Sequence, residues 1–146
     1  MTKKRVYIDG IFDLFHRGHL ESFYKTKNIY GIDQSNDVEV IVGVISDSDA
    51  ENYKRLPIIN QEDRIKIIKS IGIVDQVIFP APLIIDKIFI EENRIDLVVH
   101  GFFDKKDFEN QKEFFKVPLE LNKFKIIDYY NKISTSDIIK NIKENY

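Results

Sequence analysis

The chain has 146 residues, 43% hydrophobic and 32% charged, which fits one compact globular domain spanning residues 1–146. Its net charge of −2 provides no basic footprint for nucleic acid, and the absence of cysteine excludes disulfides, thiolate metal sites and cysteine nucleophiles. No stretch approaches the roughly 20 apolar residues of a membrane span, and no signal core follows the basic N-terminus, so we expect a soluble, cytoplasmic protein without a membrane segment.

Short β-branched runs alternate with helical stretches along the chain. Strands are predicted at 5–9, 38–46, 74–79, 95–100 and 124–128. Helices are predicted at 20–30, 61–71, 83–92, 108–115 and 136–143. This alternation is typical of βαβ units, so the predicted fold class is α/β, with a doubly wound parallel sheet and helices on both faces.

Polar clusters follow the predicted strands. In doubly wound sheets, ligands bind beyond the carboxyl ends of the strands, near the point where the strand order reverses. Polar residues follow the first, second, fourth and fifth strands, in segments 9–19, 46–55, 100–104 and 133–136. These separate segments are therefore predicted to converge on one crevice.

The segment 9–20, DGIFDLFHRGHL, is the richest in chemistry. Gly10 lets the backbone approach a ligand, and Gly18 does the same beside a helix N-terminus, where unpaired N–H groups favour phosphate. The imidazoles of His16 and His19 can donate hydrogen bonds to a phosphate under attack, as phosphoryl-type transfer requires. Zinc binding by the pair would need a third ligand, and none stands at a familiar spacing, so no metal site is predicted in the protein.

Residues 10–19, GIFDLFHRGH, resemble the signature of the cytidylyltransferases that activate phosphocholine, phosphoethanolamine or glycerol 3-phosphate. The resemblance covers nearly the whole chain and implies a Rossmann-like fold of the nucleotidyltransferase type. It implies that His16 and His19 contact the nucleotide phosphates and assist catalysis. It also implies nucleotide contacts for Ile11 and Phe12, beside Gly10 and Gly18.

Three basic residues are further candidates by the same resemblance. Lys54 matches a family lysine that bridges the phosphates of both substrates, where a cation neutralises charge as two anions approach; alone, it would be interpreted as a solvated loop lysine. Arg55 is a second candidate for that anion. Arg64 stands in a segment that resembles the family's acid-x-Arg helix entry, where it either reaches a phosphate or pairs with the neighbouring Glu62 or Asp63.

The segment 133–139, ISTSDII, resembles the family pattern I-S-T-[ST]-x-I-I. Small hydroxyls and backbone N–H groups at a helix N-terminus suit phosphate, which makes Ile133, Ser134 and Thr135 nucleotide-binding candidates. Simple N-capping by Ser134 or Thr135 is the alternative, and one residue can do both.

Two departures concern the nucleotide and the residues after the fourth strand. Where the family carries R-T-E-G, this chain has 129–132, YYNK, so the arginine is missing, with Lys132 as a displaced charge. His100 and Gly101 keep their nucleotide-binding assignment, but phenylalanines at 102 and 103 occupy the family's acidic positions. These rings either pack in the interior or stack on a base or a cationic headgroup.

The acceptor pocket departs from the family as well. Leu83 stands where the choline enzymes carry a tryptophan near the headgroup, which argues against phosphocholine, and Asp104 is the candidate substitute for the lost acidic residues. The residues assigned to the acceptor are Asp13, Arg55, Leu83 and Asp104.

These observations predict transfer of a nucleoside monophosphate, expected to be CMP from CTP, to phosphoethanolamine, phosphocholine or glycerol 3-phosphate, with release of pyrophosphate. Mg²⁺ is expected on the NTP phosphates, and no covalent enzyme intermediate is needed. A homodimer is expected because residues 72–77 keep part of a family dimerisation pattern. An adenylyltransferase of the same superfamily, a non-catalytic nucleotide-binding protein and a metal-binding module at the histidines are the alternatives.

Overall fold

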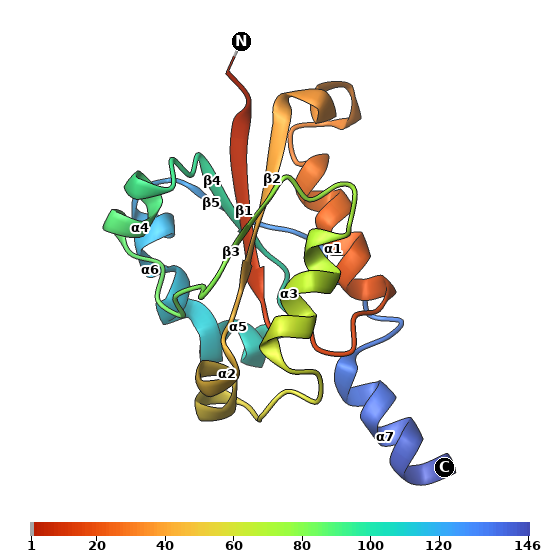
Figure 1. Cartoon of the computed structure of the whole chain (residues 1–146). Coiled ribbons are helices and arrows are strands. Elements are labelled where there is room, and N and C mark those ends of the chain that lie inside the picture. The colour runs from red at the N-terminus through yellow and green to blue at the C-terminus, as the bar shows by residue number, and fades with distance from the viewer. Residues whose placement is uncertain (1) are drawn as a thin grey trace.

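A computed structural model describes residues 2–146 and contains one sheet of parallel strands in the order β3-β2-β1-β4-β5 (Figure 1). The strands are β1 (Lys4–Gly10), β2 (Val38–Val44), β3 (Gln76–Ile78), β4 (Leu97–His100) and β5 (Phe124–Ile126). The chain moves outward from β1 to β3 and then returns to place β4 on the other side of β1. The strand order therefore reverses beside β1, and the predicted doubly wound parallel sheet is confirmed.

Helices cover both faces of this sheet. The α-helices are α1 (Arg17–Lys27), α2 (Asp47–Tyr53), α3 (Gln61–Lys69), α4 (Lys87–Glu92), α5 (Lys105–Gln111), α6 (Lys116–Glu120) and α7 (Thr135–Asn145). Two 3₁₀ helices are η1 (Ile32–Asp37) and η2 (Lys112–Phe115). Helices α1 and α3 pack on one face, α4 and α6 on the other, and α7 projects away from the body (Figure 1).

Alternation along the strands divides the core into two layers. On β1, Val6 and Ile8 pack with Phe23 of α1, whereas Tyr7 between them packs with Ile90 of α4. Successive side chains of a strand point to opposite faces, so a strand buried on both faces reads as a continuous apolar run. This is why the strand runs could be recognised in the sequence.

Side-chain N-caps set the first residue of three helices, and these starting residues differ from the prediction. Segment 46–55 was expected as a polar stretch, but it forms α2, because the Ser46 hydroxyl accepts a hydrogen bond from the Asp49 backbone N–H at 3.2 Å. Helix α4 begins at Lys87 rather than at 83, because Asp86 caps the Phe89 N–H at 2.8 Å. Helix α1 begins at Arg17, earlier than expected, with His16 as its cap.

Candidate active site

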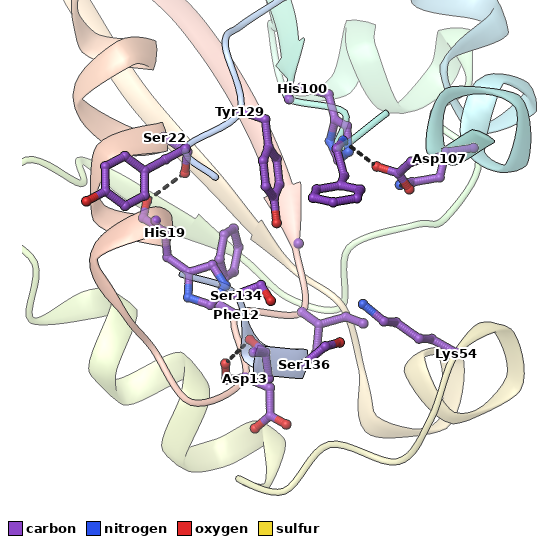
Figure 2. Close-up of a pocket in the computed structure, with 18 of the residues that line it drawn as sticks. Phe12, Asp13, His19, Ser22, Lys54, His100, Asp107, Tyr129, Ser134 and Ser136 are labelled. Carbon is purple, nitrogen blue, oxygen red and sulfur yellow. Dashed lines mark hydrogen bonds between the residues drawn. The ribbon is translucent and has the colours of Figure 1, made fainter. Parts of the chain in front are cut away.

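A pocket of about 700 Å³ lies at the carboxyl ends of β1 and β4, the region expected from the strand order (Figure 2). The predicted residues that line it are Gly10, Ile11, Phe12, Asp13, His16, Gly18, His19, Lys54, Arg55, His100, Gly101, Asp104, Ser134 and Thr135. Arg64, Leu83 and Ile133 are the predicted site residues that do not line it. The predicted convergence of four segments on one crevice is therefore found.

The two motif histidines form a stacked pair. Their ring centroids lie 3.8 Å apart with 24° between the planes. Each Nδ1 accepts a backbone hydrogen bond: Gly18 N–H donates to His16 at 3.0 Å, and His16 N–H donates to His19 at 3.3 Å. The proton of each neutral imidazole therefore resides on Nε2, which leaves one N–H donor per ring for a ligand.

Both imidazoles are neutral near pH 7. Burial lowers the pKa of His19 to about 3, with the nearby His16 and Lys54 adding to the effect. Burial also lowers the pKa of His16. The pair therefore acts by hydrogen-bond donation rather than by positive charge, and its donors remain in place across the neutral range.

Local backbone geometry fixes the loop that carries the pair. Phe12 and Leu14 have φ values of 57° and 51°, a left-handed conformation that non-glycine residues adopt at a cost. A Cβ on Gly10 would lie 2.8 Å from the Phe12 ring, and one on Gly18 would lie 2.8 Å from Cε1 of His16. Glycine at 10 and 18 is therefore required so that the rings of Phe12 and His16 can fold back over the backbone.

Asp13, predicted to bind the acceptor, lines the pocket and also has a structural role. Its carboxylate accepts the backbone N–H groups of Ile58 and Ile59 at 2.8 and 2.9 Å, and its side chain is buried. Its carbonyl oxygen accepts the hydroxyl of Thr135 at 2.8 Å. Asp13 therefore fastens two distant segments to the histidine loop, one through its carboxylate and one through its carbonyl oxygen.

The prediction for Arg64 needs correction. Its guanidinium is buried, with 1% of the residue exposed, and donates to the carbonyls of Ile11, Ile45 and Ile59 at 2.6, 3.0 and 3.0 Å. The remaining arm forms an ion pair with Asp47 at 2.7 Å. Arg64 joins the histidine loop to the start of α2 and does not line the pocket. The surface pairing with Glu62 or Asp63 is not formed either.

Two further predicted residues lie outside the pocket. Leu83 packs against the cluster of Ile45, Ala50 and Ala81, which corrects its assignment to the acceptor. Ile133 does not line the pocket, but its backbone oxygen lies beside Gly18. Its neighbours Ser134 and Thr135 do line the pocket at the N-terminus of α7, where the Ser134 hydroxyl caps the Asp137 N–H at 3.1 Å.

The structure also brings together residues that were not predicted. Asp9, the residue before the last in β1, has its side chain 6% exposed, and His100 Nδ1 lies 3.8 Å from its Oδ1, too far for a hydrogen bond. Asp107 of α5 accepts the Phe103 N–H at 2.9 Å and the Gln111 amide at 2.6 Å. Only the strand-end position of Asp9 was a signal in the sequence; nothing marked Asp107, whose place depends on α5.

Two sides of the pocket can now be distinguished. The histidine side consists of the pocket-lining residues of segment 10–19, together with Ser134 and Thr135. The Asp107 side consists of Asp9, Tyr53, Lys54, Arg55, His100, Asp104 and Asp107. Lys54 is the C-cap residue of α2, and burial lowers the pKa of its amine. Asp104 caps α5 by accepting the Asp107 N–H at 2.8 Å.

Neither a metal cluster nor a membrane helix is present in the described part of the chain. No group of three or more histidine, aspartate or glutamate side chains within residues 2–146 is arranged to hold a metal ion. The same residues include no helix that is both long enough and apolar enough to cross a bilayer.

Comparisons with known proteins agree with this site. A family model described as Cytidylyltransferase-like matches residues 7–141. This range includes β1 from Tyr7 onward, the other four strands and the residues on both sides of the pocket. This chain belongs to the cytidylyltransferase-like family. The resemblance seen in residues 10–19 is thereby confirmed.

Two similar proteins are named for two different amino alcohol phosphates. Choline-phosphate cytidylyltransferase A of Homo sapiens is 34% identical over 142 residues, covering 97% of this chain and 37% of that protein. Ethanolamine-phosphate cytidylyltransferase of Arabidopsis thaliana is 32% identical over 145 residues, covering 97% of this chain and 33% of that protein. This chain thus spans about a third of the length of these relatives.

The fold is also found in a solved structure. The lipopolysaccharide core biosynthesis protein of Thermoplasma volcanium GSS1 matches with a TM-score of 0.64 and 26% identity. The match covers 88% of this chain and 98% of that one. The Rossmann-like, nucleotidyltransferase-type fold expected from the cytidylyltransferase-like motif is therefore confirmed.

Proposed function

We propose that this cytidylyltransferase-like protein transfers CMP from CTP to a phosphorylated small alcohol and releases pyrophosphate. The observation that carries the proposal is the stacked His16–His19 pair, whose Nδ1 atoms are held by backbone N–H groups. This arrangement presents two fixed, neutral N–H donors beside the N-termini of α1 and α7. Helix N-termini favour phosphate groups, so triphosphate and donors meet on the histidine side.

The proposed chemistry is a direct displacement. A phosphate oxygen of the acceptor attacks the α-phosphorus of CTP, a new P–O–P bond forms, and the bond to the departing pyrophosphate breaks. The Nε2–H groups of His16 and His19 donate to the α-phosphate oxygens as negative charge accumulates on them. Donors that are already in position stabilise such a transition state without reorganisation.

Lys54 would bring the two anionic substrates together. It stands at the end of α2 and lines the same pocket as the histidines, and its side chain points into that pocket (Figure 2). Two phosphate groups repel each other on approach, and a cation between them offsets this repulsion. Burial and the neighbouring Arg55 lower the pKa of Lys54, and the Asp107 carboxylate opposes this shift in part.

Mg²⁺ would enter with CTP, bound through the phosphate oxygens of the nucleotide. No three ligating side chains meet within residues 2–146, and Mg²⁺ commonly keeps most of its ligands from substrate and water. The bound ion would supply charge neutralisation on the β- and γ-phosphates. The protein's own residues would orient the α-phosphate and the acceptor.

The experiment that tests this function is CTP-dependent pyrophosphate release with Mg²⁺, using phosphoethanolamine, phosphocholine and glycerol 3-phosphate as acceptors. Release with CTP and one acceptor, abolished in His16→Ala and His19→Ala, would establish the activity. Each nucleotide should also be tried in turn, since turnover with ATP alone would indicate an adenylyltransferase. CTP binding without turnover for every acceptor would overturn the proposal in favour of a non-catalytic nucleotide-binding protein.

A further inference from the structure

Two exposed aromatic side chains on the pocket wall take no part in the proposed transfer step. Phe103 is 62% exposed and Tyr129 is 38% exposed, and both line the pocket. Their ring centroids lie 5.4 Å apart with 81° between the planes, which is an edge-to-face pair. Exposing large apolar rings to water is unfavourable, so apolar surface gathered inside a pocket marks a place where a ligand binds. The pair is suited to a flat, unsaturated part of that ligand.

The structure separates Phe103 from its neighbour Phe102. The Phe102 ring packs against the rings of Phe108 and Phe115 at centroid distances of 5.1 and 5.8 Å, within the core layer that contains Tyr7. The sequence left two interpretations open for these phenylalanines, packing in the interior and stacking on a ligand. The two interpretations apply to different rings, because Phe102 packs in the core and Phe103 is exposed in the pocket.

Contacts on either side of Tyr129 fasten its segment to α1. The Lys25 ammonium donates a hydrogen bond to the carbonyl oxygen of Asp128 at 2.8 Å. The Arg17 guanidinium lies 5.2 Å from the centroid of the Tyr130 ring. The Tyr129 side chain itself points into the pocket (Figure 2). Its position is therefore set by the residues before and after it, which α1 holds.

The chain after β4 brings Phe103 to the same place. A Cβ on Gly101 would lie 3.3 Å from the Ile127 oxygen and 3.7 Å from the Tyr129 Cα, so the chain after β4 runs close beside the chain after β5. The Phe103 N–H donates to the Asp107 carboxylate at 2.9 Å, which holds this loop against α5. The two rings thus come from different loops, and each loop is held by contacts with the rest of the fold.

The pair adjoins the part of the pocket assigned to the triphosphate. Segment 129–134 leads from it to the N-terminus of α7, and Tyr129, Asn131 and Ser134 all line the pocket along this path. In a nucleotide the ribose separates the base from the phosphates, so the base lies beside the phosphate site rather than in it. Among the substrates considered, only the nucleotide carries an aromatic ring. Lys54, assigned to the acceptor phosphate, stands on a different element, at the end of α2.

We propose that Phe103 and Tyr129 form the stacking surface for the base of the bound nucleotide. This inference rests on the proposed function, because it concerns the nucleotide of that reaction. Stacking uses the flat face that every base has, and one aromatic side chain strengthens binding about fivefold or more. The groups that distinguish cytosine from uracil lie at the edge of the base, which a stacked ring does not contact. The pair therefore contributes equally to the binding of CTP and UTP, and other groups choose between them.

The test compares nucleotides with the phosphate chain alone. CTP, UTP and inorganic triphosphate are titrated by calorimetry with Mg²⁺ and without an acceptor, so that no transfer occurs. Phe103→Ala and Tyr129→Ala should each weaken CTP and UTP binding by the same factor, about fivefold or more. The affinity for inorganic triphosphate should stay within about twofold, because it has no base to stack.

Two control variants isolate the ring from the rest of the side chain. Tyr129→Phe keeps the ring and removes the hydroxyl, so the affinity for CTP should stay within about twofold. Tyr24→Ala removes a ring that is 48% exposed on α1 and does not line the pocket, so all three affinities should be unchanged. Thermal melting shows that each variant is folded, and either pocket variant suffices if the other is not.

The position of the base can be detected independently of affinity. The chain contains no tryptophan, so Phe103→Trp introduces a single one. Saturating CTP should quench its emission by stacking on the indole ring, whereas inorganic triphosphate should not. Emission that saturating CTP leaves unchanged would overturn the placement of the base at Phe103.

The outcomes separate this inference from the proposed function. An equal loss of inorganic triphosphate binding in the alanine variants would overturn it, because the rings would then shape the phosphate site. Weaker phosphocholine binding with unchanged CTP binding would assign the rings to the acceptor and overturn it as well. Equal losses of CTP and UTP binding support it, even if pyrophosphate is never released. Pyrophosphate release with unaltered CTP affinity in both variants would keep the proposed function and overturn the stacking surface.

Discussion

The two sides of the pocket are held by different kinds of interaction. On the histidine side, backbone groups fix the functional rings: Gly18 N–H holds His16, and His16 N–H holds His19. On the Asp107 side, side chains from β1, α2, β4 and α5 meet across the cavity. A site held by adjacent backbone is encoded in one continuous motif. A site assembled from distant elements can exchange residues one at a time, so substrate choice is free to change while the transfer chemistry is kept.

The largest expected effect is on turnover when a histidine donor is removed. His16→Ala and His19→Ala should each lower kcat about 100- to 1000-fold, because each removes one fixed donor to the developing charge. CTP affinity should change by much less. Steady-state kinetics with calorimetric CTP binding measures both, and Glu109→Gln serves as the unaffected control. A proportional loss of CTP affinity would mean that the pair binds the ground state instead.

The next largest effect is on stability, and it concerns Arg64, which joins the histidine loop to the start of α2. Arg64→Met should lower the free energy of unfolding by about 3 kcal/mol, because the carbonyls of Ile11 and Ile45 lose a buried donor and Asp47 loses its ion pair. Urea unfolding measures it. Arg17→Met, at an exposed arginine paired with Glu21, is the matched control and should change stability by less than about 1 kcal/mol. Similar losses in both variants would contradict the joining role of Arg64.

A smaller effect separates catalytic geometry from stability. In Gly18→Ala, the new Cβ would press against Cε1 and Nδ1 of the His16 ring at 2.8 and 3.0 Å. Displacing one donor should lower kcat about ten- to a hundredfold. Stability should change by less than about 1 kcal/mol, since alanine is favoured over glycine in a helix. Unchanged kcat in this variant would show that the His16 position is not critical.

The predictions made from the sequence succeeded or failed according to how local their causes were. The strands were recognised from apolar runs, and His16, His19 and Gly18 from one motif at a strand end. Arg64 was misread because its partners Ile11 and Ile45 are far away in the chain and only the fold buries its guanidinium. Leu83 was misread for a similar reason, since it packs beneath α2.

The sequence by itself determined the parallel α/β fold, the family and the histidine side, because alternating apolar runs and a contiguous glycine–histidine motif act through neighbouring residues. Only the tertiary structure decided which charges share the pocket. Asp9 and Asp107 are 98 positions apart, yet both line one pocket together with Tyr53 and His100. Coulombic interactions depend on distance in space and on burial, and neither is written in the spacing of residues along the chain.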